Sequence, residues 1–325
     1  MVWDCSIGPF LFRKNKYHPK VKSEKVSFRN WFILFFLGSI WGSSFILLKI
    51  GSRSFDTIDL AAGRMFFASI ILLPFLLSIV RKYDRKIVFW MFFSALVGST
   101  IPAFLYSFSA SRMDSNVNGV INSLTPIFTL VVGMIWLRNP TSKLSILGVV
   151  IGFIGVIILI TQRDVSTEQN KFALFPLAAT ILYGINMNVV KVKLGHLPSI
   201  DILKGVFGFI ALIFAPIVIY NGVLNNIDFS LWSPQFWIHS DITEVQKMNS
   251  LTAIVFLGLI GTLFASWLFY LLMKSTNALF ASMNTYLMPL MAIFWGWLDG
   301  EPIGWPHFIS LFVILIGVYL VSKRK

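Results

Sequence analysis

The chain has 325 residues, of which 56% are hydrophobic and only 13% are charged. Soluble globular proteins are nearer about 45–50% hydrophobic and about 25% charged. A water-soluble fold of this length could not bury so much apolar surface, so we expect most of the chain to face lipid. The net charge of +13 could suggest a nucleic-acid partner. The basic residues lie in short segments between apolar runs, however, so no nucleic acid is expected.

The sequence has few residues that could form disulfides or bind a metal ion. Its single cysteine, Cys5, excludes an intramolecular disulfide framework. The histidines are far apart in the sequence and lack the spacing of a metal site. We therefore predict no metal and no cofactor.

Residues 1–29 are polar and basic, and we expect them to form a cytoplasmic N-terminal arm. No signal-peptide core precedes Trp31 and no small-residue cleavage site follows the first apolar run, so we expect that run to be retained as a membrane span. Ten apolar runs lie along the chain, at 31–50, 60–80, 87–110, 116–137, 143–161, 171–191, 201–220, 250–272, 277–298 and 304–322. As helices at ~1.5 Å per residue they cross ~30 Å of hydrocarbon, and strands of such length are rare. The predicted fold is an all-α integral membrane protein with ten transmembrane helices.

The basic residues also predict an orientation. If the N-terminus is cytoplasmic, most of the 27 Lys and Arg residues lie on that side, in the arm, the 81–86 turn and the basic tail 323–325 among other segments. An excess of this kind follows the positive-inside rule. We expect both termini in the cytoplasm and the protein in the plasma membrane, which in bacteria is the inner membrane.

The two halves of the chain resemble each other. A shift of 142 positions matches the first two spans with spans six and seven, and from the third span onward the shift is 163. The matched residues include Trp41 with Tyr183, Lys49 with Lys191, Asp59 with Asp201, Gly98 with Gly261, Pro126 with Pro289 and Gly133 with Gly296. The repeats are expected at 30–162 and 170–322, and the longer shift reflects an extracytoplasmic loop near 221–249. Because five spans are an odd number, the second repeat must enter the membrane from the opposite side, an inverted arrangement common in secondary transporters.

Several short motifs occur in the order found in one transporter family. They are Trp41-Gly42-Ser43-Ser44 with Lys49, Arg64, Ile101-Pro102-Ala103-Phe104, Asn122-Ser123-Leu124-Thr125-Pro126, Thr285-Tyr286 with Pro289, and Asp299-Gly300-Glu301. From about residue 30 to 322 the chain resembles EamA-type transporters of the drug/metabolite transporter superfamily. The resemblance implies two five-helix repeats around a central cavity lined by spans one to four and six to nine. It also implies export of amino acids or related metabolites.

The chain departs from this family after the fourth span, where the family often has Glu and this chain has Arg138. Any role of that first-half Glu is therefore not expected to carry over. The second half keeps Glu301, beside Asp299. We expect these acids to cap the following helix, which Pro302 would help to start; proton coupling is the alternative.

Polar residues in the fourth span fall on one helical face: Ser115, Asn118, Asn122, Thr125 and Thr129 recur at spacings of three and four. Amides in hydrocarbon are costly unless they are paired, so this stripe should face the bundle interior or a wet cavity. Hydrogen bonding between neighbouring helices is the alternative. We favour a cavity. The predicted cavity-lining or solute-binding residues are Trp41, Ser44, Arg64, Tyr106, Asn118, Asn122, Tyr183, Asn186, Trp267, Tyr270, Thr285 and Tyr286.

Arg64 lies near one end of the second span, where a guanidinium is costly unless it reaches water or a partner. Asp56 and Asp59 are the nearest acidic residues in the sequence. We favour a structural ion pair with one of them over a role in solute binding or gating.

The expected function is secondary transport by alternating access, with export of amino acids or similar small organic metabolites. Import or flipping of another small or amphipathic metabolite is the alternative. An enzyme is not expected, because the spans hold no nucleophile with a base, no paired carboxylates and no metal cluster. The expected partners are a small solute and the lipid bilayer, and a homodimer is left open.

Overall fold

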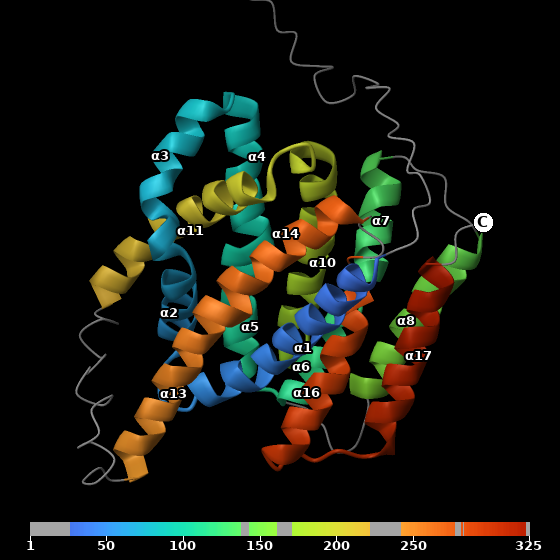
Figure 1. Ribbon diagram of the computed structural model, residues 1–325. Helices are drawn as coiled ribbons and strands as arrows, with labels where there is room; N and C mark the ends of the chain where they lie inside the picture. Colours follow the sequence, from blue (N-terminus) through green and yellow to red (C-terminus); the bar gives the residue numbers. More distant parts are fainter. Residues whose placement is uncertain are drawn as a thin grey trace, which may run out of the picture.

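The structure is a computed structural model that describes residues 27–137, 143–160, 171–221, 242–276, 281 and 283–322. Every regular element in these ranges is helical. The α-helices are α1 (Phe28–Gly51), α2 (Thr57–Ser69), α3 (Leu73–Lys82), α4 (Arg85–Ala95), α5 (Ile101–Ala110), α6 (Ser115–Asn122), α7 (Thr125–Leu137), α8 (Lys143–Ile160), α10 (Leu174–Val189), α11 (Ser199–Asn221), α13 (Ile242–Gly258), α14 (Ala265–Ser275), α16 (Leu287–Leu298) and α17 (Trp305–Ser322). Many of them join end to end into longer rods (Figure 1).

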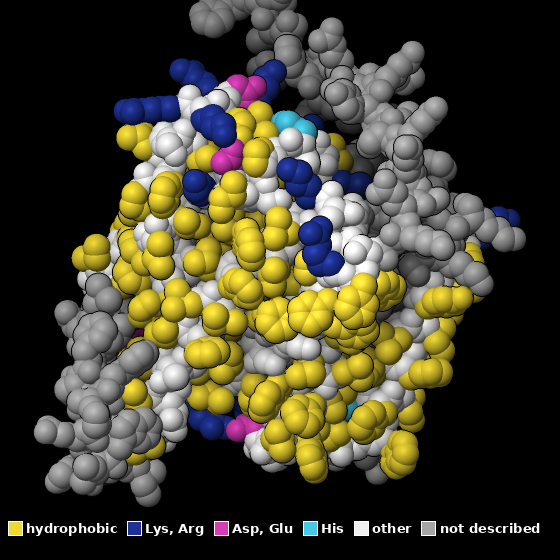
Figure 2. Space-filling view, in the orientation of Figure 1, with side chains coloured by type: hydrophobic (Ala, Val, Ile, Leu, Met, Phe, Trp, Pro, Cys, Tyr) yellow, Lys and Arg dark blue, Asp and Glu magenta, His cyan; other side chains and the backbone are white. Residues whose placement is uncertain are grey.

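Seven of these rods are long and apolar enough to cross a membrane, and three shorter apolar helices lie at 146–155, 287–298 and 305–317. Hydrophobic side chains cover the middle of the visible face, whereas Lys and Arg gather at the end where α3 meets α4 (Figure 2). This is the surface of a protein embedded in lipid, with its charges kept at the interfaces. The chain is an integral membrane protein.

The helix bounds differ from the predicted spans at one place in particular. Helix α13 begins at Ile242, inside the segment that the sequence predicts as a loop near 221–249. Residues 242–249 include Glu244, Gln246, Lys247 and Met248, which form helix readily but carry too little apolar character to register as part of a span. The helix therefore extends beyond its apolar part.

Glycines let equivalent helix pairs cross closely. A Cβ atom on Gly42 of α1 would lie 2.7 Å from the carbonyl oxygen of Met288, at the start of α16. At the position matched by the 142 shift, a Cβ on Gly184 of α10 would lie 2.8 Å from the backbone of Phe128 in α7. Small residues at both crossings bring backbones into contact, as is usual where helices pack within a membrane.

Two π-helical segments interrupt the rods at matching places. Segment η2 (Leu96–Thr100) joins α4 to α5, and η5 (Leu259–Phe264) joins α13 to α14. The 163 shift places Leu96 on Leu259, so both irregularities begin at the same position of the repeat. Such π-bulges are frequent at functional sites.

At one edge of the bundle α8 and α17 run side by side (Figure 1). A Cβ on Gly317 would lie 2.6 Å from the carbonyl oxygen of Gly148 and 2.6 Å from the amide nitrogen of Gly152. Because these contacts are with backbone, neither helix can yield by moving a side chain. The face of α8 that carries Gly148 and Gly152 is therefore a packing surface.

We expect Gly317→Ala to force α8 and α17 apart and to lower the free energy of unfolding by about 1–3 kcal/mol. Thermal unfolding in detergent measures this. Gly304→Ala is the matched control, because a Cβ there meets only the ring of Pro306, at 3.3 Å. Equal stability of the two variants would contradict the close packing.

Candidate functional site

A cavity of about 140 Å³ lies in the middle of the bundle. It is lined by Trp41, Ser44, Phe45, Leu48, Arg64, Met65, Gly98, Ser99, Ala103, Tyr106, Asn122, Thr125, Tyr183, Asn186, Met187, Gly261, Thr262, Ser266, Phe269, Tyr270, Asn284, Thr285 and Met288. These residues come from α1, α2, η2, α5, α6 and α7 in the first half and from α10, η5, α14, the short helix η6 (Met283–Tyr286) and α16 in the second. Helix α11, the counterpart of α2, contributes none. The π-segments η2 and η5 both contribute to the wall.

Most lining residues form pairs related by the sequence repeat. The pairs are Trp41/Tyr183, Ser44/Asn186 and Phe45/Met187 at the 142 shift, and Gly98/Gly261, Ser99/Thr262, Ala103/Ser266, Tyr106/Phe269, Asn122/Thr285 and Thr125/Met288 at the 163 shift. Leu48, Arg64, Met65, Tyr270 and Asn284 remain outside this pairing. Both halves therefore contribute the same positions to one cavity.

The aromatic wall follows this pairing. Trp41 packs on Phe269 with ring centroids 5.4 Å apart, and Tyr106 stacks on Tyr183 at 6.0 Å. The two pairs are equivalent, because Trp41 matches Tyr183 and Tyr106 matches Phe269, and each pair joins one ring from each half. The Tyr106 and Tyr183 rings are 21° from parallel and give the cavity a flat apolar surface, whereas the Trp41 and Phe269 rings are tilted by 52°.

Arg64 is the charged residue of the wall, and its surroundings correct the predicted ion pair. Its side chain is buried, and its Nε donates a hydrogen bond of 2.9 Å to Oγ1 of Thr262. No acidic side chain in the described part of the chain lies within 4.0 Å of the guanidinium. Asp56 instead caps α2, where it accepts from the amides of Ile58 and Asp59. The ion pair predicted from closeness in the sequence is absent because α2 turns the Arg64 side chain toward the bundle interior.

A close helix contact holds Thr262 against Arg64. A Cβ on Gly258 would lie 2.8 Å from the carbonyl oxygen of Arg64, so α13 meets α2 backbone to backbone. Thr262 lies four residues further on and donates to the carbonyl oxygen of Leu257 at 2.8 Å. The π-segment thus directs the Thr262 hydroxyl to the arginine.

Three amides line the cavity and differ in their partners. Asn122 accepts from the Tyr106 hydroxyl at 2.6 Å, and Asn186 accepts from Ser94 at 2.6 Å. Asn284 is buried, and neither its amide nitrogen nor its amide oxygen has a hydrogen-bond partner within the described structure. A buried polar group without a partner is costly. Sequence reasoning missed Asn284, because the face of the ninth span through Thr285 holds mainly small apolar residues.

Most of the residues predicted to line a cavity do so. Asn118 does not: it accepts a hydrogen bond from Ser109 in a packed layer beside the cavity. Trp267 faces away from the cavity and packs against Phe264 at 5.8 Å, because on α14 it is out of phase with the lining residues. Tyr286 ends the short helix 283–286, but its side chain lies outside the described part of the structure. That the lining residues bind a solute remains a prediction.

The predicted polar stripe of the fourth span divides into two parts. Asn122 and Thr125 line the cavity, whereas Ser115 and Asn118 make hydrogen bonds between helices. Thr129 donates to the carbonyl oxygen of Thr125 within its own helix. Cavity lining and helix–helix bonding both occur, at different depths of one face.

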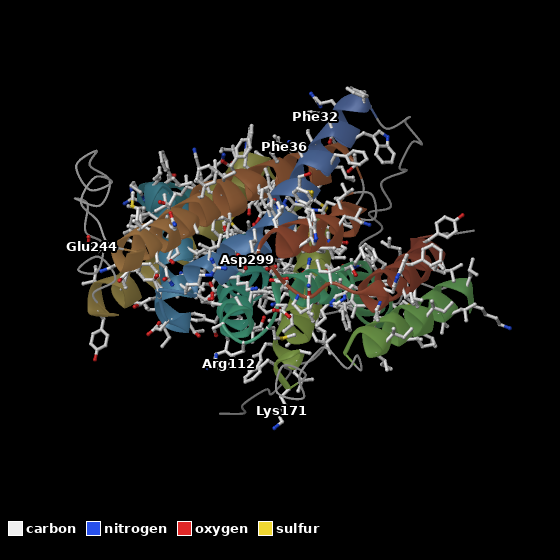
Figure 3. All side chains as sticks on the ribbon, turned by 90° about the horizontal axis from the view of Figure 1, so that it is seen from below. Phe32, Phe36, Arg112, Lys171, Glu244 and Asp299 are labelled. Carbon is white, nitrogen blue, oxygen red and sulfur yellow. The ribbon has the colours of Figure 1, made fainter. Side chains whose placement is uncertain are left out.

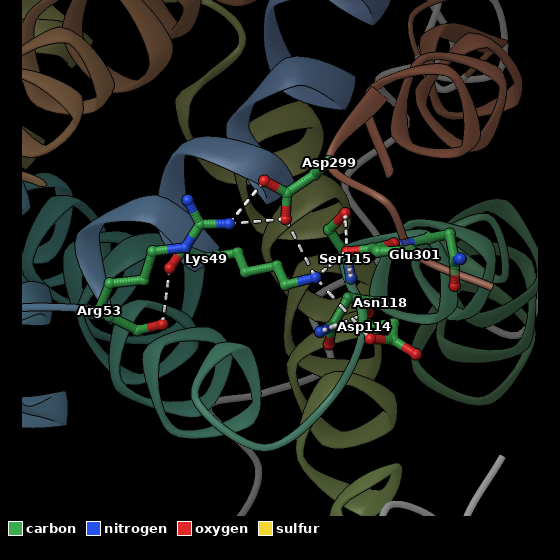
Figure 4. Close-up of polar contacts among 9 residues, drawn as sticks. Lys49, Arg53, Asp114, Ser115, Asn118, Asp299 and Glu301 are labelled. Carbon is green, nitrogen blue, oxygen red and sulfur yellow. Dashed lines mark hydrogen bonds and ion pairs between the residues drawn. The ribbon is translucent and has the colours of Figure 1, made fainter. Parts of the chain in front are cut away.

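A charged cluster closes the bundle beyond this packed layer (Figure 4). Lys49 at the end of α1 lies 2.7 Å from Glu301, 3.2 Å from Asp299 and 3.8 Å from Asp114. Arg53 binds both carboxylate oxygens of Asp299, at 2.5 and 2.8 Å. Asp299 lies near the centre of this end, which we call the Glu301 end, when it is viewed from below (Figure 3). The cluster ties α1 to the α16–α17 connection and to the start of α6.

Glu301 caps α6. The prediction that it caps the helix following it in the sequence is wrong. Its carboxylate accepts from the Ser115 amide at 2.8 Å, the Ser115 hydroxyl at 2.7 Å and the Asn116 amide at 3.1 Å. A carboxylate is stabilised at a helix N-terminus by the unpaired amides and the helix dipole. Helix α17 begins only at Trp305, beyond Pro302. Because Glu301 is far from α6 in the sequence, no local sequence pattern predicts this cap.

The flanking acids of the cluster differ in proton affinity. Burial, with the nearby Glu301 carboxylate, raises the pKa of Asp114 above its usual value, although Lys49 partly offsets this. Burial alone would also raise the pKa of Asp299, but hydrogen bonds from Arg53 and Lys49 outweigh it and hold that pKa below its usual value. On acidification Asp114 therefore takes up a proton first. The ion pairs of Asp299 persist until the pH falls through its lowered pKa.

At the opposite end, where α3 meets α4, Asp201 holds the turn to the start of α11. It accepts from Lys82 and from the Tyr83 hydroxyl, both at 2.6 Å. Asp201 matches Asp59 in the sequence repeat. In the described part of the chain, no group of three His, Cys, Asp or Glu side chains could hold a metal ion.

The sequence model of the EamA-like transporter family matches residues 29–161 and 170–323, one copy for each half of the chain. The chain belongs to this family. It is therefore a membrane transporter, built on two copies of the EamA unit.

Named relatives cover almost the whole chain. It is 25% identical over 300 residues to the uncharacterized inner membrane transporter YedA of Escherichia coli K12, covering 90% of each chain. It is 22% identical over 298 residues to an uncharacterized transporter of Archaeoglobus fulgidus, covering 91% of this chain and all of the other. A solved crystal structure matches with a TM-score of 0.54 at 14% identity, covering 88% of this chain and 94% of the other, and shows a similar fold.

We expect Glu301→Gln to destabilise the protein by about 3 kcal/mol, because it removes a buried charge from Lys49 and from the α6 amides. Unfolding in mixed detergent micelles measures this. Asp299→Asn is the comparison, since the Asp299 carboxylate is 16% exposed and its partner Arg53 is 43% exposed. We expect it to cost below about 1 kcal/mol. A larger loss for Asp299→Asn than for Glu301→Gln would contradict this ranking.

Proposed function

We propose that the protein is a secondary transporter that exports amino acids or similar small organic metabolites by alternating access. The observation that carries the proposal is the pairing of repeat-related residues around one central cavity. A cavity made from two equivalent halves can open to either side when the halves exchange conformations.

The proposal includes ten transmembrane helices in two inverted five-helix repeats. In its favour, the equivalent crossings of Gly42 and Gly184 and the equivalent π-segments η2 and η5 recur in the two halves. The three shorter apolar helices count as spans in this scheme. The gathering of Lys and Arg at the α3–α4 end supports a cytoplasmic location for that end and for both termini (Figure 2).

The size of the cavity supports a small solute. At about 10–15 Å³ for each water-sized sphere, a cavity of about 140 Å³ has room for about ten such spheres. A small amino acid fits this space. A lipid-sized molecule does not fit in this conformation.

The charged cluster supports a role in closing the outer side. Asn118 and Ser109 are buried and hydrogen-bonded to each other, and Asn118 lies on α6 between Asn122, which lines the cavity, and Ser115, which binds Glu301. We propose that this layer closes the path toward the Glu301 end. We propose that the Lys49–Glu301 pair breaks when the outer side opens. No nucleotide site is evident in the sequence, so we propose that a gradient of solute or protons drives transport.

Purified protein in liposomes tests the function. We expect at least one labelled amino acid from a panel to enter vesicles preloaded with the same unlabelled compound faster than it enters protein-free vesicles. Asn122→Ala should slow this exchange at least several-fold, because the amide lines the cavity and anchors Tyr106. Asn249→Ala, at an exposed position, is the matched control and should leave the rate unchanged. The proposal fails if no amino acid or related metabolite exchanges above the protein-free rate.

Tags at both termini and within 221–241 test the inverted arrangement. We expect the terminal tags to be protected from an added protease in intact cells and the internal tag to be cleaved. Permeabilised cells, in which all three tags should be cleaved, are the control. Termini found on opposite sides of the membrane would overturn the inverted repeat.

A further inference from the structure

We propose that the central cavity is a site for organic anions, in which Arg64 binds the carboxylate of the solute. This inference rests on the proposed transport function and narrows its substrate class. It places small solutes that carry a carboxylate and an apolar body, amino acids among them, above neutral or cationic solutes of the same size.

The charges around the cavity point to an anion. Among the lining residues, Arg64 carries a charge, and the wall holds no Asp, Glu, Lys or His. The guanidinium is buried and has no acidic partner in the described structure. A buried charge without a counter-charge is unfavourable, and a bound carboxylate supplies the missing one. A solute with a net positive charge would find no carboxylate in this wall.

The geometry of Arg64 leaves the two terminal nitrogens of the guanidinium available to a solute. Its hydrogen bond to Thr262 engages Nε, and neither terminal nitrogen has an acceptor in the described part of the chain. An arginine fork can bind both oxygens of a carboxylate in parallel hydrogen bonds. The bond to Thr262 fixes the fork from behind, so less freedom is lost when the anion binds.

Two further features match a carboxylate with an apolar body. Tyr106 and Tyr183 lie within electrostatic reach of Arg64, and their stacked rings form a flat surface next to the charge. Asn284, buried on the same cavity with an unpaired amide, offers a second polar contact to a bound solute. Pockets of this kind bind through apolar walls and a few polar anchors.

Arg64 breaks the repeat at this point. The 142 shift matches it with Val206, which is buried and does not line the cavity. Paired positions supply the shape of the cavity from both halves, but a single half supplies its charge. The carboxylate would therefore be held by one half while the other half moves around it.

Benzoate, benzamide and benzamidine test the proposal, because they share one shape and differ in charge from negative through neutral to positive. Binding of each to the purified full-length protein in detergent can be followed through tryptophan fluorescence, since Trp41 lines the cavity. We expect benzoate to bind at least tenfold more tightly than benzamide, and benzamidine to bind more weakly still. Comparable affinity for the three compounds, or no detectable binding of benzoate, would overturn the anion site.

Substitutions at Arg64 provide a second test of the anion site. Arg64→Gln should lower benzoate affinity about ten- to a hundredfold, the range for losing a hydrogen bond to a charged group, and leave benzamide affinity nearly unchanged. Arg64→Lys should restore part of the preference, because it keeps the charge without the fork. Arg81→Gln, at an exposed position near the α3–α4 end, is the matched control. A selective loss of benzoate binding excludes misfolding as the cause, since benzamide reports on the same cavity. Unchanged benzoate affinity in Arg64→Gln overturns the proposal.

These measurements separate the anion site from the transport function. If benzoate binds selectively but no solute exchanges across liposomes, the proposed transport fails and the anion site stands. If amino acids exchange but benzoate and benzamide bind alike, transport stands and the anion site fails.

Discussion

Lipid leaves the backbone no hydrogen-bond partner, and this constraint governs where the fold can be irregular. A chain within a membrane must satisfy its amides in helices, and breaks are tolerated only where they are buried in protein or line a cavity. The π-segments η2 and η5 and the break between α6 and α7 obey this rule, because Gly98, Gly261 and Asn122 beside them all line the central cavity. These three irregularities therefore lie at the cavity, whereas η1 (Ile70–Leu72) and η3 (Val190–Leu194) lie outside its wall.

Shape and charge are distributed differently over the two halves. The cavity wall and its two aromatic pairs are built from repeat-related positions, so both halves give similar surfaces. The charged group of the cavity wall and the acid that caps α6 do not repeat, although other charges, such as Lys49 and Asp59, do. Arg64 is matched by Val206, and Glu301 is matched by Arg138, which lies outside the described residues. Symmetry of shape allows two related conformations, and asymmetry of charge would make their free energies unequal. Such a difference sets which conformation predominates when no solute is bound.

The sequence predicts features that depend on pattern along the chain. Apolar runs predict helices in lipid, and the two constant shifts match positions that meet in the cavity, such as Tyr106 with Phe269. Prediction from the sequence fails for side-chain partners that are set by contacts between distant helices. Glu301 caps α6 across the bundle, Trp267 turns away from the cavity, and Arg64 meets Thr262 in place of a nearby acid. Local spacing holds no information on which helix will lie opposite, so these partners could not be derived from it.

The central claim is that one cavity serves both sides of the membrane. Ser44 lines it, and Ser44→Cys in a Cys5→Ser background places a single small thiol there. The measurement is the rate at which a membrane-impermeant thiol reagent labels this cysteine in right-side-out and in inside-out vesicles. We expect labelling from both sides, with Glu301→Gln increasing the rate from the outside and decreasing it from the inside, because the mutation weakens the closed Glu301 end. Labelling confined to one side, whatever residue stands at 301, would contradict it.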